Sequence, residues 1–289
     1  MLRPYLYIAP SFIVLLVFSI FPIVLALVIS FTGMNLFGLV DPSRIRFAGL
    51  ANYVELLSSA VFRQTIFNTL YYVVLGVPIV VFLSLTLAVL INVDSGPLFK
   101  AYRSIYYLPS VTNMVAVAVV WMYLYNTRAG LFNQILASFG LPGPNWLGDP
   151  STAKISLVIL AVWRACGFNM LIFLAALQGI PREFYEAAKM DGASAVRRVF
   201  SITIPLLRHA ILFVTITTVA GWLQFFEEPY IMTKGGPLGS TMSMSLFIFQ
   251  TGFTGNRFGF AAAGSFVLFV IIVAVTGVQL WISKRGEGK

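Results

Sequence analysis

Six blocks of apolar residues, each roughly 20 or more residues long, divide this chain of 289 residues. A helix of about 20 residues spans the roughly 30 Å of hydrocarbon in a bilayer. The strands of a membrane barrel would alternate polar and apolar residues over about 10 positions, whereas these blocks are apolar on every face. Only 10% of the residues are charged, against about 25% in a typical soluble domain. The sequence therefore predicts an all-α polytopic membrane protein.

The six predicted transmembrane helices cover approximately residues 5–32, 64–92, 105–125, 153–179, 208–228 and 258–282. Pro10, Pro22 and Pro78 fall inside the first two, where a missing amide N–H bends a helix. The N-terminal apolar run is longer than the roughly 7–15 residues of a signal-peptide core, so we expect it to be the first span. No internal repeat is visible, and residues 1–289 are expected to form a single transmembrane domain.

The basic residues predict which side of the membrane each loop faces, because Lys and Arg accumulate in short cytoplasmic loops. If the N-terminus is cytoplasmic, eleven of the 19 basic residues lie inside, in the shorter segments. These are Arg3, Lys100, Arg103, Arg182, Lys189, Arg197, Arg198, Arg208, Lys284, Arg285 and Lys289. Arg164 falls within the fourth span, and the others lie in the longer loops. We therefore expect both termini to be cytoplasmic.

The longer loops, about 33–63, 126–152 and 229–257, would lie outside. Two of them contain amphipathic stretches, LANYVELLSSAVF and GLFNQILASFG, that look like short helices along the membrane interface. The third contains a Gly-Gly-Pro turn followed by an apolar, Met-containing segment. These loops could form a docking face for an outside partner or could merely cap the bundle, and the residues alone leave both open.

The chain lacks the residues of an ATP-binding or catalytic site. No Gly-x-x-x-x-Gly-Lys-Ser/Thr loop occurs, and the single histidine and single cysteine leave no zinc or Cys–His constellation. Glu227 and Glu228 are the only carboxylates near a span, at its outer end, where water can solvate them. A proton-coupled transporter usually buries carboxylates nearer mid-membrane. We expect no catalytic residue, no metal and no cofactor bound by this chain.

The stretch EAAKMDGASAVRRVFSITIPLLR, residues 186–208, is unusual between two apolar spans. Pro181 is suited to the first turn of a new helix. Gly192 permits the left-handed conformation that ends a helix, and Ser194 can cap a second one, which Pro205 closes. Small alanine side chains would let another surface approach closely. The residues predict a helix, a sharp turn and a second helix that docks a partner, with an ordinary cytoplasmic connector as the alternative.

This stretch resembles the EAA loop of binding-protein-dependent ABC transporter permeases, in which Glu-Ala-Ala is followed by a glycine, a hydrophobic residue and a proline. The matching positions are Glu186, Ala187, Ala188, Asp191, Gly192, Ala193, Phe200 and Pro205. The resemblance covers nearly the whole chain, including FAGLANYVELL, YRSIYYLPSVTNMVAVAVVW and LQGIPREFYEAAKMDGAS. It is to the carbohydrate-type permeases, on the side of the maltose-transporter first subunit.

The resemblance implies the type I ABC importer permease fold and half of a translocation pathway for a sugar or sugar derivative. It also implies a second homologous permease, an extracytoplasmic solute-binding protein, and two cytoplasmic ATPase subunits that hold ATP and Mg. The EAA residues would lie in a cleft of an ATPase, with Glu186 meeting a basic group and Gly192 making the bend. Such a chain resides in a bacterial or archaeal plasma (inner) membrane. An ion-gradient-driven secondary transporter and a membrane anchor for a cytoplasmic enzyme are the alternatives.

Arg164 is the strongest indication of a solute pathway. A charge left facing lipid costs at least about 2.5 kcal/mol, so Arg164 must face a cavity, a partner chain or a counter-charge. Neighbouring aromatic faces and a few hydrogen-bonding groups suit a sugar ring. The candidates are Ala161, Arg164 and Phe168 on the fourth span and Thr218, Trp222, Gln224 and Phe225 on the fifth. Structural pairing of Arg164 is the alternative, and solute contact would favour an anionic or phosphorylated polyol.

Overall fold

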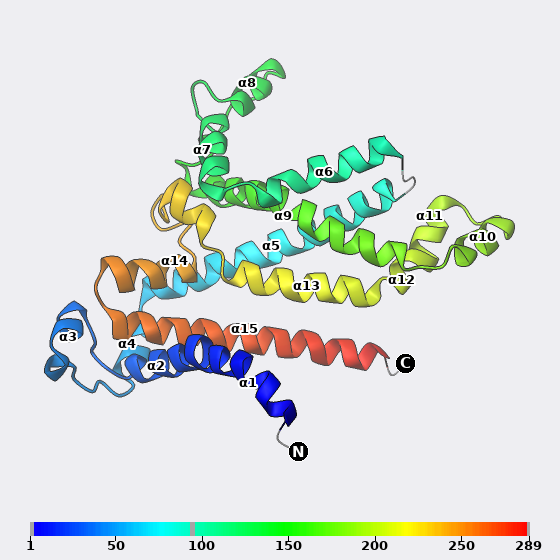
Figure 1. The fold of residues 1–289 in the computed structure, drawn as a ribbon. Helices are drawn as coiled ribbons and strands as arrows, with labels where there is room; N and C mark the ends of the chain where they lie inside the picture. Colours follow the sequence, from blue (N-terminus) through cyan, green and yellow to red (C-terminus); the bar gives the residue numbers. More distant parts are fainter. Residues whose placement is uncertain (1–2, 93–95, 288–289) are drawn as a thin grey trace. The chain divides into compact units, whose positions relative to one another are not determined.

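The computed structural model describes residues 3–92 and 96–287 (Figure 1). By their internal contacts these residues divide into two compact units. Unit 1 comprises residues up to Thr65 together with Met244–Ala274. Unit 2 comprises Ile66–Ser243 and the chain from Val275 onward. The described residues are largely helical, with one isolated antiparallel β-bridge between Thr32 and Phe47. The prediction of an all-α chain is confirmed.

Unit 1 brings the N-terminal helices together with α14 and most of α15. Its elements are α1 (Arg3–Leu15), the π-helical turn η1 (Leu16–Ile20), α2 (Phe21–Ser30), α3 (Leu36–Val40), the 3₁₀ turn η2 (Pro42–Arg44), α4 (Ala51–Ser58), the start of α5 (Ala60–Ile91), α14 (Met244–Phe249), the π-helical η5 (Gln250–Thr254) and α15 (Phe258–Glu287) as far as Ala274. The π-helical turn directly precedes Pro22, where a bend is expected from the sequence. The buried Asn52 amide donates to the carbonyls of Ser30 and Thr32 and thereby fixes α4 to the end of α2.

Unit 2 contains the rest of α5 and the central helices of the chain. They are α6 (Pro97–Val111), α7 (Met114–Leu124), α8 (Leu131–Ser138), α9 (Pro150–Gln178), α10 (Arg182–Met190), α11 (Ala195–Arg198), the π-helical η3 (Val199–Thr203), α12 (Ile204–Leu206), α13 (Arg208–Leu223) and the π-helical η4 (Pro229–Thr233). Both amphipathic stretches predicted to be short helices are helical, as α4 and α8.

Four helical stretches in the described residues are long and apolar enough to cross a membrane, and two bent helix pairs raise the number to six. The four are Tyr7–Ser30, Ala60–Ile91, Pro150–Gln178 and Phe258–Arg285. The bent pairs are α6 with α7, at 97°, and α11–α12 with α13, at 69°. Four of the six predicted spans therefore correspond to single helices, and the third and fifth correspond to candidate spans only if each bent pair is counted as one.

The third predicted span, 105–125, is not one helix, because the chain bends sharply after Val111. Pro109 lies in the last turn of α6 and cannot donate an amide hydrogen bond to the preceding turn. Asn113 then begins α7, and its side-chain oxygen accepts from the amides of Val115 and Ala116 at 2.9 and 3.4 Å. The cap satisfies amides that a new helix would otherwise leave unpaired. Proline and cap together replace the expected straight helix with an elbow.

The fifth predicted span, 208–228, ends earlier than expected. Helix α13 stops at Leu223, and Gln224 is its C-terminal cap. Phe225 follows the helix, and Glu227 and Glu228 directly precede η4. Glu228 is itself helical, with φ −62° and ψ −54°, and Pro229 lies in the first turn of η4, where its missing N–H is tolerated. The two carboxylates consequently lie at the start of the next helical segment, beyond the end of α13.

The packing of unit 2 depends on close contact between helix backbones. A buried apolar cluster joins α5, α9 and α13, and its members are Ala88, Ile91, Met170, Phe173, Leu174, Leu177, Leu207 and Val214. A Cβ on Gly167 of α9 would collide with the backbone oxygen of Tyr106 on α6. Only glycine fits there, since small residues let membrane helices approach most closely. This contact fixes how α9 presents its side chains beside α6.

Candidate functional site

The segment after α9 folds as the predicted helix, turn and second helix. Gly192 adopts φ +74°, a left-handed conformation that glycine takes without steric cost. The Ala193 amide then donates to the Ala188 carbonyl at 2.9 Å, which closes the end of α10. Ser194 begins α11, and its hydroxyl accepts from the Arg197 amide at 3.3 Å. The turn chemistry predicted from the sequence is confirmed.

The two prolines of this segment lie differently from the prediction. Pro181 is the N-terminal cap of α10, with extended ψ of 135°, rather than a residue of its first turn. Pro205 lies inside α12, and the chain bends one residue after that helix, at Leu207. A proline is tolerated in the first turn of a helix, where its missing N–H has no partner to lose. The element nevertheless ends one residue after Pro205 and before α13 begins, as predicted.

The segment α10–α12, which we call the coupling segment, presents small and apolar groups to its surroundings. Of the eight residues predicted for coupling, Ala188 and Ala193 are half-buried and the other six are exposed. Phe184, Met190 and Phe200 are each more than half exposed. The Tyr185 hydroxyl lies 3.0 Å from Thr203 Oγ1 and connects α10 to η3. The arrangement suits docking against another surface, and the coupling role of these residues remains a prediction.

A cavity of about 530 Å³ surrounds Arg164. It is lined by Ser110, Ala161, Arg164, Ala165, Phe168, Asn169, Gly221, Trp222, Gln224, Phe225, Phe226, Glu227 and Glu228. Six of the seven residues predicted for the solute pathway are in this lining. Thr218 is the exception, because it is buried one turn before Trp222 and does not line the cavity.

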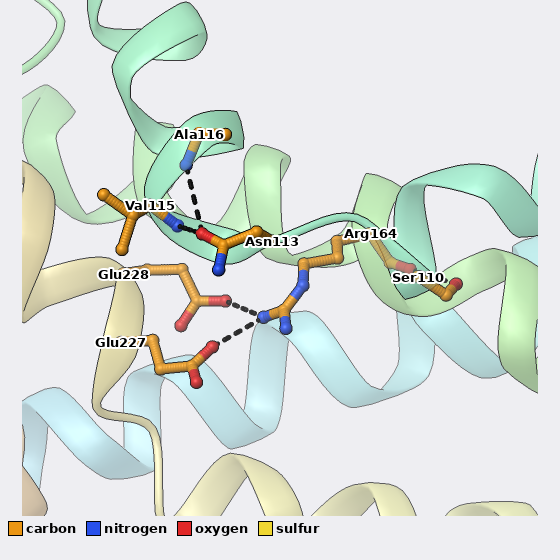
Figure 2. Close-up of polar contacts among 7 residues, drawn as sticks. All are labelled: Ser110, Asn113, Val115, Ala116, Arg164, Glu227 and Glu228. Atoms are coloured by element: carbon orange, nitrogen blue, oxygen red, sulfur yellow. Dashed lines mark hydrogen bonds and ion pairs between the residues drawn. The ribbon is translucent and has the colours of Figure 1, made fainter.

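Two carboxylates converge on Arg164 in this cavity (Figure 2). Arg164 Nη1 donates to Glu227 Oε2 at 2.9 Å and lies 3.6 Å from Glu228 Oε1. The Glu228 side chain is 8% exposed, whereas that of Glu227 is 53% exposed. Arg164 Nε is buried and has no hydrogen-bond partner among the residues that the structure describes. The arginine thus faces both a cavity and a counter-charge, two of the three surroundings expected for it.

Ser110, at the end of α6, positions the backbone that carries Arg164. Its hydroxyl donates to the Arg164 carbonyl at 2.7 Å and accepts from the Phe168 amide at 3.1 Å. These two backbone groups are one helical turn apart on α9, so a single side chain holds the turn from which Arg164 projects. The α6–α7 elbow beside it places Asn113 near the arginine and the two carboxylates (Figure 2).

The aromatic residues of the cavity differ in how available they are. Trp222 and Phe225 stack with ring centroids 5.4 Å apart and are 7% and 6% exposed. A Cβ on Gly76 of α5 would collide with the Trp222 ring, so the indole packs directly on that helix. Phe168, at 55% exposure, is the open aromatic surface. Trp222 consequently contributes mainly to packing, and Phe168 is better placed to contact a solute.

The partners of Arg164 are not evident from the sequence. Hydropathy places Glu227 and Glu228 at the outer end of a straight helix, where water would solvate them, and it gives Ser110 no role. One available signal is the charge itself, because a cation inside a span needs a counter-charge and these are the nearest acidic residues to any span. The hydroxyl contact of Ser110 has no comparable sequence signal, since it depends on the α6–α9 spacing.

Residues 45–287 match the family described as Binding-protein-dependent transport system inner membrane component. The chain is 35% identical over 287 residues to the lactose transport system permease protein of Rhizobium radiobacter, covering 97% of this chain and 94% of that protein. It is 36% identical over 280 residues to the trehalose/maltose transport system permease protein of Thermococcus litoralis, covering 97% and 93% of the two chains.

The fold is similar to that of a chain in the crystal structure of a bacterial ABC transporter involved in the import of the acidic polysaccharide alginate. The TM-score is 0.84 at 24% identity, covering 98% of this chain and 95% of that chain. A chain of the MetNI methionine ABC transporter gives a TM-score of 0.53 at 17% identity, covering 77% of this chain and 92% of that one. These similarities confirm the predicted type I ABC importer permease fold.

Proposed function

The chain belongs to the family of binding-protein-dependent transport system inner membrane components, and on that premise we propose that it forms half of the pathway by which an importer moves a neutral sugar. As a multi-pass ABC transporter permease it is a transport subunit, which the family match favours over an ion-gradient-driven carrier. The full-length similarity to lactose and trehalose/maltose permeases supports a carbohydrate solute.

The observation that carries the solute class is the charge balance around Arg164. The cavity lining holds one guanidinium and two carboxylates. Since Glu227 already balances the charge of Arg164, an added anionic solute would meet no unpaired cation in this cavity. This reverses the expectation that Arg164 alone would favour an anionic or phosphorylated polyol. The charge arrangement supports an uncharged solute.

The remaining groups of the cavity suit a sugar ring. The Arg164 side chain, which is 27% exposed, offers donors to solute hydroxyls, and the 53% exposed Glu227 carboxylate offers acceptors. Phe168 offers an aromatic face to the apolar side of a ring. Together they provide a donor, an acceptor and a stacking surface within one cavity of about 530 Å³.

The proposal extends to the partners of this chain. A second, homologous permease would complete the pathway, and an extracytoplasmic binding protein would deliver the sugar. Two ATPase subunits would bind ATP and Mg and receive the coupling segment, with Glu186 meeting a basic group. The excess of basic residues in the shorter loops supports cytoplasmic termini. The chain would act as one permease domain in a bacterial or archaeal plasma membrane.

Uptake by the assembled transporter tests this function. Affinity-tagged chain is purified with its co-expressed partners, reconstituted in vesicles with the binding protein, and supplied with radiolabelled neutral or anionic oligosaccharides. We expect a second permease and an ATPase to co-purify and a neutral sugar to be taken up only with ATP. Uptake that requires an ion gradient instead of ATP would contradict the importer, and preferential uptake of an anionic sugar would contradict the neutral class.

A further inference from the structure

A second cavity, of about 840 Å³, lies where α9 ends and the coupling segment begins. We call it the arginine cavity. Its lining comprises Val89, Asn92, Arg103, Leu177, Gln178, Ile180, Arg182, Tyr185, Ala195, Arg198, Val199 and Thr203. These residues come from the C-terminal ends of α5 and α9, from α6, and from both sides of the turn at Gly192. The cavity therefore lies between the coupling segment and parts of α5, α6 and α9.

The lining of this cavity is strongly positive. Arg103, Arg182 and Arg198 belong to it, and no carboxylate does. None of the three forms an ion pair with any of the residues in 3–92 and 96–287. The acidic residues of α10, Glu183 and Glu186, are exposed and do not line the cavity. Three like charges that share one cavity repel one another unless an anion lies between them.

Arg103 gives a second, independent indication of a ligand. Its Nε is buried and has no hydrogen-bond partner in the part of the chain that the structure describes. A buried donor without a partner costs roughly 1–3 kcal/mol, and more when it is charged. In most protein structures such a donor has a hydrogen-bond partner, which is a protein group, a water molecule or a bound ion. This donor lies in the same cavity as the three arginines, none of which has an ion-pair partner among the described residues.

We propose that the arginine cavity binds a phosphate-bearing anion. A guanidinium presents a planar set of N–H donors that matches phosphate oxygens in pairs. Asn92 and Gln178 add neutral amide groups to the lining, and the cavity volume is within the range of about 300–1,000 Å³ typical of small-ligand sites. Basic pockets between membrane helices are known to accept phosphate headgroups. The same chemistry would accept a soluble phosphorylated compound.

The position of the arginines makes the ligand a regulator rather than cargo. Arg103 belongs to α6, whereas Arg182 and Arg198 belong to the coupling segment. A phosphate group that contacts arginines of both sets ties the coupling segment to α6. Its occupancy would restrain movement of α10 and α11 without any contribution from the cavity at Arg164. The proposal of this anion site therefore does not depend on which solute the transporter carries.

Anion binding to the complete transporter tests the site. The complex is reconstituted in phosphatidylcholine discs, with phosphatidylglycerol added in one arm and radiolabelled inorganic pyrophosphate in the other. Retained lipid is measured by native mass spectrometry and pyrophosphate by equilibrium binding. We expect Arg103→Gln and Arg198→Gln each to weaken binding about tenfold, as for loss of one charged hydrogen bond. If the variants retain less phosphatidylglycerol, the ligand is a lipid headgroup. If they bind less pyrophosphate, the ligand is a soluble phosphate.

The same helices provide matched controls. Lys100 on α6 and Arg197 on α11 are exposed and lie outside the cavity lining. Lys100→Gln and Arg197→Gln remove the same charge, and we expect them to leave binding unchanged. Equal losses in all four variants would show a diffuse surface effect, and absence of binding by the unaltered complex in both arms would also overturn the site. If Arg103→Gln does not assemble, two other variants test the site. They are Arg198→Gln, at a half-buried position, and Arg103→Lys, which keeps the charge. We expect both to bind the anion more weakly than the unaltered complex.

Discussion

The guanidinium of Arg164 donates a hydrogen bond of 2.9 Å to Glu227, although 63 residues separate them in the sequence. The contact joins the middle of α9 to the segment that follows α13. Glu228, beside it, is almost fully buried and lies 3.6 Å from the same nitrogen. The arginine therefore compensates a buried carboxylate as well as bonding an exposed one. Removal of either partner affects both the charge of the cavity and the stability of unit 2.

Arg164→Gln should destabilise the protein through Glu228. Loss of one partner from a buried ion pair leaves an uncompensated charge and costs roughly 3–5 kcal/mol, less where water reaches the pair. We expect a clearly lower thermal-unfolding temperature in detergent. The double variant Arg164→Gln/Glu228→Gln should recover most of the loss, because it removes the stranded charge. Equal stability of Arg164→Gln and the unaltered chain would show that Glu228 does not depend on the arginine.

Ser110→Ala should impair uptake more than it impairs folding. The change removes the hydroxyl that bonds the Arg164 carbonyl and the Phe168 amide, at a cost of about 1 kcal/mol. We expect uptake by the reconstituted transporter to fall severalfold at constant protein level. Ser104→Ala is the control on the same helix, since that exposed hydroxyl bonds only the Lys100 carbonyl of its own helix. Similar uptake by both variants would contradict a positioning role for Ser110.

Gly167→Ala should separate α6 from α9. The added Cβ would collide with the Tyr106 carbonyl oxygen, a backbone atom that cannot rotate away. Overpacking of this kind costs about 1–3 kcal/mol or more. We expect a lower unfolding temperature and reduced expression. Gly277→Ala on α15 has open space around the new atom and should be neutral or slightly stabilising, so matching losses in the two variants would refute the packing explanation.

The turn at Gly192 should tolerate asparagine better than valine. The φ of +74° is accessible to asparagine at modest cost, whereas a β-branched side chain is a severe outlier there. A Cβ added at Gly192 would have no atom within 4 Å, so the effect is conformational and not a clash. We expect Gly192→Val to abolish transport-stimulated ATP hydrolysis by the complex and Gly192→Asn to retain a large part. Equal activity of the two variants would exclude the turn as the cause.

Unit 1 should lose part of its stability in acid through Glu55. Two hydrogen bonds of 2.8 and 2.7 Å from Arg257 hold the pKa of Glu55 below its usual value. A depressed folded-state pKa stabilises the protein above the unfolded value of about 4.3 and ceases to do so as pH falls through the folded value. We expect the protection of the α4 amides against hydrogen exchange, relative to the intrinsic rate at each pH, to fall below that pH. Glu55→Gln should remove the added acid sensitivity, and persistence of the same sensitivity would assign it to another group.

Periodicity and turn chemistry predict much of the fold because they are local. The short helices α4 and α8, the left-handed Gly192 and the cap at Ser194 each depend on residues within one turn. The α6–α7 elbow is not predicted, although Pro109 and Asn113 are visible in the sequence, because the apolar run through both residues reads as one span. The Arg164–Glu227 contact escapes prediction for another reason: it depends on where α13 ends, which hydropathy places only within a few residues.

The bend of 69° at Leu207 has a mechanical consequence for the cavity at Arg164. Because α12 and α13 are not collinear, a displacement of the coupling segment reaches α13 as a torque about Leu207 rather than as a push along its axis. A helix of 16 residues is about 24 Å long, so a rotation of about 5° moves its far end by about 2 Å. That end carries Gly221 and Trp222, which line the cavity. A small rotation of α13 at its Leu207 end would thus change the width of the cavity at Arg164.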